Sequence, residues 1–318
     1  MQLSLILKGM AMGFAEAIPG VSGGTIAFIT GIYERLLNAI GNILGPQVIG
    51  TFRREGIAAA WKKADGGFIL QLGIGMVAGL ATAVVTITEL LDAYPPVVWA
   101  FFFGLIISSA VYVGKQVDKW NVLNFIILAL GFGVAFLLTS VNPLAGSSNL
   151  LLVFLAGTIA ISALILPGIS GSFILLILGM YTIVFSAVRN LGNLEASAFA
   201  IVGVFALGCL IGLALFSRVL SYTFKRFPDQ TLALLTGFML GSLGKLWPWR
   251  NPLTYRTNSH GEQVPLLEDN VLPANYTEGD TFMAAVVIAF LTGLIIVFVL
   301  DYYSPKHVDE GDLIEEVL

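Results

Sequence analysis

Residues 15–33 read AEAIPGVSGGTIAFITGIY, and residues 163–181 read ALILPGISGSFILLILGMY. The two stretches align without a gap and are identical at nine of 19 positions. Proline cannot continue a helix comfortably and glycine permits a reversal of the chain, so an apolar helix should break at each Pro-Gly pair. The two predicted breaks are Pro19-Gly20 and Pro167-Gly168. The chain therefore contains an internal repeat built around a broken helix.

The composition around these motifs is that of a membrane protein. Of 318 residues, 57% are hydrophobic and 11% are charged, whereas soluble domains carry roughly 25% charged residues. This excludes a soluble enzyme and a nucleic-acid-binding domain, and the many apolar runs exclude a single-span receptor. The runs are continuous rather than alternating, which disfavours a β-barrel. We expect an all-α polytopic membrane protein whose surroundings are the bilayer.

Ten apolar segments follow one another along the chain. They cover 3–18, 21–44, 68–92, 96–114, 121–140, 149–166, 168–188, 196–222, 230–246 and 282–301. As a helix, the first would extend only about 24 Å, short of the roughly 30 Å hydrocarbon core. We therefore expect each Pro-Gly pair to join two arms of a re-entrant helical hairpin. Alternatively, each pair forms two full spans joined by a tight turn. In that case too the chain would return to the face from which it entered.

A second set of matching residues, at a different spacing from the first, extends the repeat. Gly75, Gly79, Pro95, Gly104 and Ser109 match Gly208, Gly212, Pro228, Gly237 and Ser242. Each half thus reads as a re-entrant hairpin followed by two transmembrane helices, with an extra polar insert at 46–67 in the first half. The expected divisions are repeat 1 at 3–114, a linking helix at 121–140, repeat 2 at 149–246, an external loop at 247–281, a C-terminal helix at 282–301 and a tail at 302–318.

The parity of the spans predicts that the two repeats have inverted topology. Three full crossings separate them, so the second copy starts from the opposite face. Inverted repeats with broken helices are a recurring transporter architecture, and the breaks mark the binding site. Nine Lys and Arg residues fall on one face and four on the other, so the positive-inside rule puts both termini in the cytoplasm. Trp247 and Trp249, at the start of the external loop, are expected to be interfacial anchors.

The residues after each break suit an anion. A helix start presents unpaired N–H groups and the positive end of the helix dipole, and glycines let a phosphate approach the backbone. The predicted phosphate-binding residues are Ser22, Gly23, Gly24, Thr25, Ser170, Gly171 and Ser172. Alternatively, Ser22 and Ser170 are simple N-caps, which would account for the serines but not for their duplication.

A basic residue should complete a phosphate site. Arg35 is the first candidate, since it lies in an apolar segment close to the first motif. Arg218 and Lys245 are weaker candidates, because bases near span ends often only extend to the membrane interface.

Two acids in the first hairpin are candidates for proton coupling or gating. Glu16 lies three residues before Pro19, where a carboxyl group in a low-dielectric region could gain and lose a proton. Alternatively, Glu16 caps exposed backbone N–H groups. The equivalent position in the second half is Leu164, so any proton chemistry would be asymmetric. Glu34 is the second acid, and it could instead pair with Lys8 to hold the hairpin closed.

Few residues could carry out catalysis. The only histidines, His260 and His307, fall in the external loop and the tail. A histidine-based phosphatase, protease or metal site therefore cannot be assembled within the membrane, and there is no Walker A sequence for ATP hydrolysis. We expect no catalytic residue, no metal and no cofactor.

The motifs resemble a known family. The stretch KGMAMGFAEAIPGVSGGTIAFITGIYERLL (8–37), with ISALILPGISGSFILLILGMY (161–181), resembles the bacterial PopT family of undecaprenyl-phosphate translocases. The resemblance covers nearly the whole chain, including the segments at 95–109 and 227–249. It implies that a C55 polyprenyl monophosphate is returned from the outer to the inner leaflet of the bacterial cytoplasmic membrane. The lipid is then reused in envelope glycan synthesis, including peptidoglycan.

The resemblance predicts a flippase that works by alternating access with a lateral opening for the lipid tail. Two other functions stay open. A secondary transporter of a small anionic solute would use the same anion site with a closed aqueous path. A membrane enzyme acting on a lipid phosphate is disfavoured by the missing intramembrane histidines. The expected partners are the polyprenyl phosphate lipid and the bilayer, and the sequence does not identify a protein partner.

Overall fold

The computed structural model describes residues 2–16, 22–43, 45–141, 144, 146–257 and 263–303. The predicted break at Pro19-Gly20, both histidines and the tail from residue 304 lie outside these residues. The helices are α1 Leu3–Glu16, α2 Gly23–Ile29, α3 Tyr33–Ile43, α4 Pro46–Glu55, α5 Ile57–Lys63, α6 Gly66–Ala93, α7 Pro95–Gly114, α8 Val122–Ser140, α9 Leu150–Ile165, α10 Gly171–Ile177, α11 Tyr181–Asn190, α12 Ala196–Arg226, α13 Pro228–Ser242 and α14 Met283–Tyr303, with short 3-10 helices η1 Leu191–Asn193, η2 Leu243–Leu246 and η3 Pro273–Asn275. The strands are β1 Arg250–Thr257 and β2 Gln263–Asn270.

The predicted class, a helical multi-pass membrane protein, is confirmed. Among the described residues, four helices are long and apolar enough to cross a bilayer, namely α6, α7, α8 and α12. The pair α10–α11 is a fifth candidate, bent by 107° at its break. Large apolar side chains on these helices face outward, as Val122 and Leu137 of α8 do at 77% and 63% exposure. A bilayer covers such a surface, while water would not.

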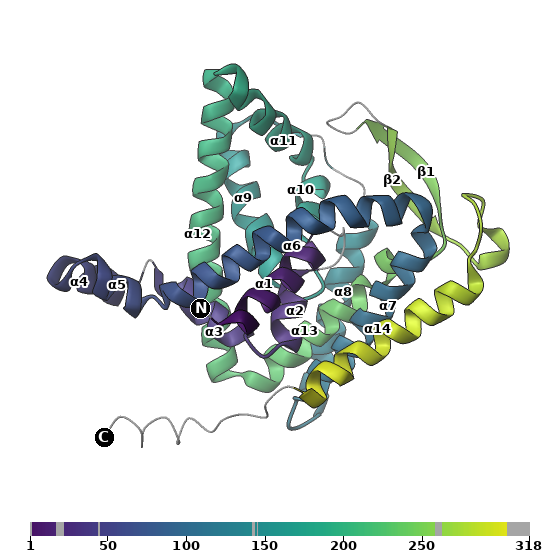
Figure 1. Ribbon diagram of the computed structural model, residues 1–318, viewed down its shortest axis with the longest axis horizontal. Coiled ribbons are helices and arrows are strands. Elements are labelled where there is room, and N and C mark those ends of the chain that lie inside the picture. Colours follow the sequence, from purple (N-terminus) through teal and green to yellow (C-terminus); the bar gives the residue numbers. More distant parts are fainter. Residues whose placement is uncertain are drawn as a thin grey trace.

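The internal repeat is visible in how the helices pack. In the first half, Gly75 and Gly79 of α6 bring that helix against α1, where a Cβ on either glycine would overlap the carbonyl oxygen of Ile6 or Met10. In the second half, Gly208 and Gly212 of α12 lie in the same way against Phe154 and Thr158 of α9. Figure 1 shows α1 along α6 and α9 along α12. The glycines of the second set of matching residues thus serve close helix packing, because small residues let backbones approach.

The linking helix α8 and the C-terminal helix α14 have equivalent partners. Gly104 of α7 lies against Phe290 of α14, and its repeat mate Gly237 of α13 lies against Leu128 of α8. The predicted repeats, 3–114 and 149–246, include neither helix. The structure instead pairs one with each half, so the repeated unit has one more helix than was predicted.

The second arm of each predicted hairpin is itself broken, which corrects the single segments expected at 21–44 and 168–188. The chain turns between α2 and α3 at Gly31, with φ +70°, and between α10 and α11 at Gly179, with φ +68°. The turns carry matching hydrogen bonds, from Ile32 N to Ala27 O at 3.0 Å and from Met180 N to Leu175 O at 2.9 Å. Glycine adopts this left-handed conformation without a Cβ penalty, so both breaks follow from the repeated glycine.

One contact is not repeated. Helix α3 lies along α12, where Tyr33 packs edge to face on Phe224 with ring centroids 5.8 Å apart. Arg218 of α12 also donates from Nε to the carbonyl of Gly41 at 2.9 Å. The repeat mates of these helices are α11 and α6. No comparable packing joins those two within the described ranges, so the two halves have different conformations.

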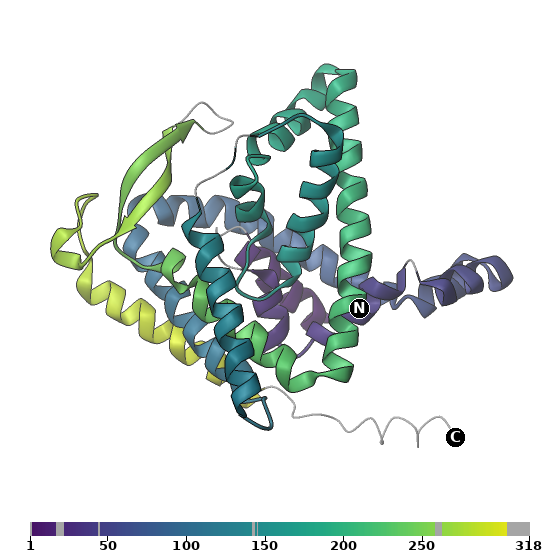
Figure 2. The same ribbon diagram turned by 180° about the vertical axis from the view of Figure 1, so that it is seen from behind.

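The loop at 247–281 contains a strand pair that sequence analysis did not predict. Strands β1 and β2 are antiparallel, and Figure 2 shows them at the opposite end of the molecule from α4 and α5, which project from the body. Trp249 is only 7% exposed and packs against Ala100 and Val286. Its ring nitrogen donates to the carbonyl of Thr281, and that of Trp247 donates to Val271. Trp249 therefore anchors the loop to α7 and α14, and the place of both tryptophans at a membrane interface stays a prediction.

Candidate functional site

The first motif begins with a capped helix. Ser22 precedes α2, and its Oγ accepts from Gly24 N at 3.0 Å, which is the N-cap arrangement. The same Oγ donates to the carbonyl of Leu164 in the second half at 2.9 Å. Ser22 and Thr25 are both fully buried. Ser22 thus caps its own helix and also bonds to the other repeat.

The structure brings the two motifs together, as the sequence predicted. Besides the Ser22 bond, Thr25 Oγ1 accepts from Gly168 N at 3.3 Å, and Tyr33 donates from its hydroxyl to Ile165 O at 3.1 Å. Gly24 faces the backbone at Ile165 so closely that a Cβ would overlap the carbonyl oxygen. The hydroxyls of Ser22 and Thr25 are therefore both engaged with the second motif.

Glu16 occupies the place where an anion would sit at the start of α2. Its Oε2 accepts from Gly23 N at 2.8 Å. This is the geometry of the capping role, since a carboxylate stabilises the positive end of a helix. Leu164 at the equivalent position leaves the second motif without such an acid. A proton-coupling role for Glu16 stays a prediction.

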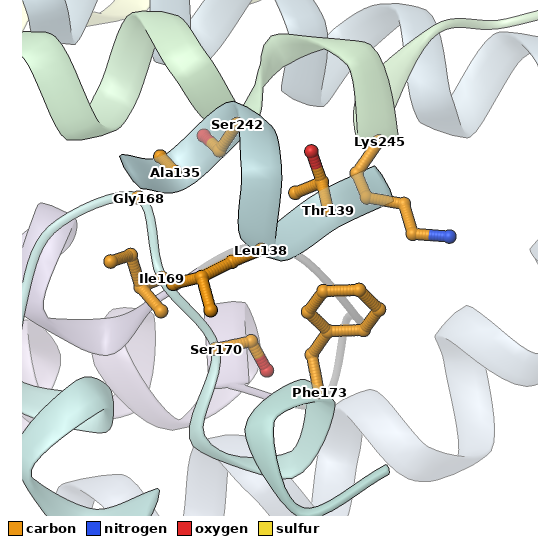
Figure 3. Close-up of a pocket in the computed structure, with 9 residues that line it drawn as sticks. All are labelled: Ala135, Leu138, Thr139, Gly168, Ile169, Ser170, Phe173, Ser242 and Lys245. Atoms are coloured by element: carbon orange, nitrogen blue, oxygen red, sulfur yellow. The ribbon is translucent and has the colours of Figure 1, made fainter. Parts of the chain in front are cut away.

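The second motif lines a cavity. Ser170 precedes α10 without capping it, and its Oγ lies 2.9 Å from that of Ser172. The lining residues are Ala135, Leu138, Thr139, Gly168, Ile169, Ser170, Phe173, Ser242 and Lys245. Figure 3 shows Thr139, Ser242 and Lys245 on one side and Ile169, Ser170 and Phe173 on the other. The volume of about 20 Å³ is room for roughly one water molecule.

Lys245 is the charged residue at this cavity. Its Nζ lies 5.1 Å from the centroid of the Phe173 ring, within the range of a cation–π contact. Within the part of the chain that the structure describes, this ammonium makes no hydrogen bond and no ion pair. Glu268, the acid that acts on it electrostatically, is bonded to Arg250 at 2.6 Å. Lys245 is thus available to an anion.

Arg35 is held elsewhere. Its guanidinium bonds to Asp65 through two nitrogens, at 2.7 and 3.0 Å, and stacks over the Phe68 ring. The side chains of this pair are 52% and 40% exposed. In this conformation no bond found among the described residues links Arg35 to either motif. Its role in binding phosphate stays a prediction.

The other charged candidates of the first hairpin do not form the expected pair. Lys8 donates from Nζ to the carbonyl of Thr30 at 2.7 Å, and not to Glu34. Glu34 is exposed in the first turn of α3. The predicted gating role of Glu34 is untested.

Two residues at the second motif were underrated or missed. Lys245 ranked below Arg35 because a base near a span end usually extends to the interface, and Phe173 was not considered. The sequence does contain a signal for Lys245. It lies three residues after Ser242, which the repeat matches to Ser109. Among the described residues, no group of three or more His, Cys, Asp or Glu side chains could hold a metal ion.

Comparison with known proteins gives consistent results. Residues 12–264 match the model of the VCA0040-like family, described as undecaprenyl phosphate translocase-like. A polyprenyl-phosphate transporter of Vibrio cholerae is 41% identical over 308 residues, covering 96% of this chain and 97% of that protein. A polyprenyl-phosphate transporter of Staphylococcus aureus is 30% identical over 255 residues, covering 76% and 85%. No solved structure matches.

Proposed function

The chain belongs to the undecaprenyl phosphate translocase-like family, and we propose that it moves undecaprenyl phosphate from the outer to the inner leaflet of the bacterial cytoplasmic membrane. Both relatives carry the names of transporters of polyprenyl phosphate. The protein therefore translocates its lipid without converting it chemically, and the returned carrier is reused in envelope synthesis.

The observation that carries this proposal is the meeting of the two broken-helix motifs. Three hydrogen bonds join residues 22–33 to residues 164–168 across the two halves. Broken helices that meet at the interface between repeats are where transporters bind substrate. The headgroup binds at these motifs, while the isoprenoid tail stays in the bilayer along the exposed apolar helices.

Alternating access accounts for the one unrepeated contact. With the topology inverted as predicted, α3–α12 and α6–α11 lie toward opposite faces of the membrane. Closed packing at α3–α12, without its counterpart at α6–α11, corresponds to a state closed toward the cytoplasm. In the opposite state the two halves exchange these conformations, so that the headgroup site opens inward.

The predicted phosphate-binding residues fit this cycle if the two motifs contact the headgroup one after the other instead of together. Ser22 and Thr25 bond to the second motif, so they reach a headgroup only after those bonds open. Ser170 lines the cavity and shares one hydrogen bond with Ser172. The second motif is therefore the first contact for phosphate, and the first motif joins when the halves rearrange.

The test is leaflet exchange of labelled undecaprenyl phosphate in liposomes that contain the purified protein. We expect exchange that depends on the protein and is absent for undecaprenol, which lacks the phosphate. The same vesicles should not accumulate inorganic phosphate. Uptake of phosphate without exchange of the lipid would contradict the proposal and favour the transporter of a small anionic solute.

A further inference from the structure

The two halves differ in charge at one repeat position. The register that matches Gly104 to Gly237 and Ser109 to Ser242 also matches Tyr112 to Lys245. The structure supports that register, because both glycines contact equivalent partner helices. A cation thus stands at the end of α13, in η2, where the first half has a neutral ring.

Lys245 lines the cavity together with polar side chains from three other parts of the fold. The hydroxyls at the cavity belong to Thr139 of α8, Ser170 before α10 and Ser242 of α13 (Figure 3). Thr139 and Ser242 donate to the helix carbonyls of Phe136 and Met239. Their protons are therefore engaged, and donors for an anion must come from Lys245 and the second motif.

The second motif supplies one such donor. The bond between Ser170 Oγ and Ser172 Oγ uses only one of the two hydroxyl protons. When Ser172 is the donor, the proton of Ser170, which lines the cavity, is left for an oxygen in the cavity. With the three protons of the Lys245 ammonium, this makes a donor set suited to a phosphate monoester, which carries up to two negative charges and only acceptor oxygens in that state.

We propose that Lys245, with Ser170 and Ser172, binds the phosphate monoester headgroup at the end of the second motif and that the Lys245–Phe173 contact closes this site when it is empty. The inference rests on the proposed function. The cavity of about 20 Å³ is too small for a phosphate group, so Lys245 must leave the Phe173 ring for the headgroup to enter. A charge-assisted bond to phosphate then replaces a weaker contact with an aromatic face.

The difference between Lys245 and Tyr112 gives the cycle a direction. Under the predicted orientation, the Lys245 side opens to the outer leaflet and the Tyr112 side opens to the cytoplasm. Attraction to a cation favours capture of an anionic headgroup on the outside. At the inner side the equivalent position carries no charge, so the headgroup is held less tightly and released.

The first test measures binding of undecaprenyl phosphate to protein in nanodiscs of neutral lipid. We expect Lys245→Gln to weaken binding about tenfold and Lys245→Arg to keep most of it. Lys119→Gln, which removes an exposed lysine far along the chain from the cavity, is the matched control and should bind normally. Inorganic phosphate should compete only weakly, and displacement at equal concentration would overturn the lipid headgroup as the ligand.

The second test restores the charge chemically. In a Cys209→Ala background, Lys245→Cys should lose leaflet exchange, and aminoethyl methanethiosulfonate should restore it by attaching an ammonium through a mixed disulfide. A neutral reagent of similar size should not. Normal exchange by Lys245→Gln or by unmodified Lys245→Cys would overturn this inference alone. Absence of exchange by the active wild-type preparation would instead overturn the proposed function.

Discussion

Glu16 has two predicted roles, capping a helix and exchanging a proton, and its geometry allows them to be separated. Its carboxylate accepts from Gly23 N, a bond that either an acid or an amide side chain could make. The cap and the charge are therefore separable by one substitution. The alternative of a purely structural cap, open from the sequence, can be tested without removing the cap.

Glu16→Gln should abolish leaflet exchange while leaving the protein folded. The amide oxygen still accepts from Gly23 N, but the side chain can no longer gain and lose a proton. Exchange of labelled undecaprenyl phosphate, measured with and without an imposed pH gradient, is the readout. Glu55→Gln, which changes an exposed acid in α4, serves as the control. Leaflet exchange at the wild-type rate by Glu16→Gln would contradict a role for proton exchange at Glu16.

The candidate site was only partly predictable at the scale of residues. The hydroxyls and glycines after each Pro-Gly pair were predicted as a facing set. Ser22 instead bonds to Leu164 and Thr25 to Gly168, residues before or at the second break, so the facing set stays a prediction. The partner of Arg35 was not predictable, because Asp65 lies 30 residues away and its approach depends on how α6 packs. Lys245 was undervalued for the same reason: Phe173 and the cavity are tertiary features.

At the scale of elements, close helix packing depends on glycines that contact the backbone of the neighbouring helix. Gly79 of α6 faces the carbonyl of Met10, whereas Gly73 of the same helix has nothing within 4 Å of a Cβ. The two positions share a helix and a residue type, and they differ only in what lies opposite. They form a matched pair for testing whether the α1–α6 contact depends on close approach.

Gly79→Ala should destabilise the protein by about 1–3 kcal/mol, the usual cost of overpacking, because α1 must move away from α6. Gly73→Ala should be neutral or stabilise by about 0.5–1 kcal/mol, since alanine is the better helix former. Thermal unfolding in detergent, followed by the loss of monodisperse protein, gives the comparison. Equal effects of the two substitutions would contradict the packing role of Gly79.

At the scale of elements, the helices were largely predicted from apolar runs, and the exceptions have physical causes. The break inside each second arm depends on Gly31 and Gly179, which also fit a continuous helix at the cost of stability. The strands β1 and β2 follow no alternating apolar pattern, as the run Arg250-Asn251-Pro252 illustrates. Their position depends on docking through Trp249, a tertiary contact that the local sequence does not encode.

At the scale of the whole molecule, the two halves share most of their helix contacts but not all of them. Helices α1, α6, α7 and α14 pack as α9, α12, α13 and α8 do, so each half includes a helix that lies outside the aligned motifs. The match of α14 with α8 was hidden because their sequences share little beyond Gly293 and Gly131. The contact between α3 and α12 breaks the equivalence, and transport by alternating access requires that it open.

A disulfide across this contact tests the account most directly. An added Cβ at Gly41 would lie 3.3 Å from Ser217 Oγ, so Gly41→Cys with Ser217→Cys in a Cys209→Ala background can join α3 to α12. We predict that the oxidised double variant does not exchange undecaprenyl phosphate between leaflets and that a reductant restores exchange. Each single variant should exchange under both conditions. Full exchange by the cross-linked protein would contradict the opening of α3–α12 as a step of transport.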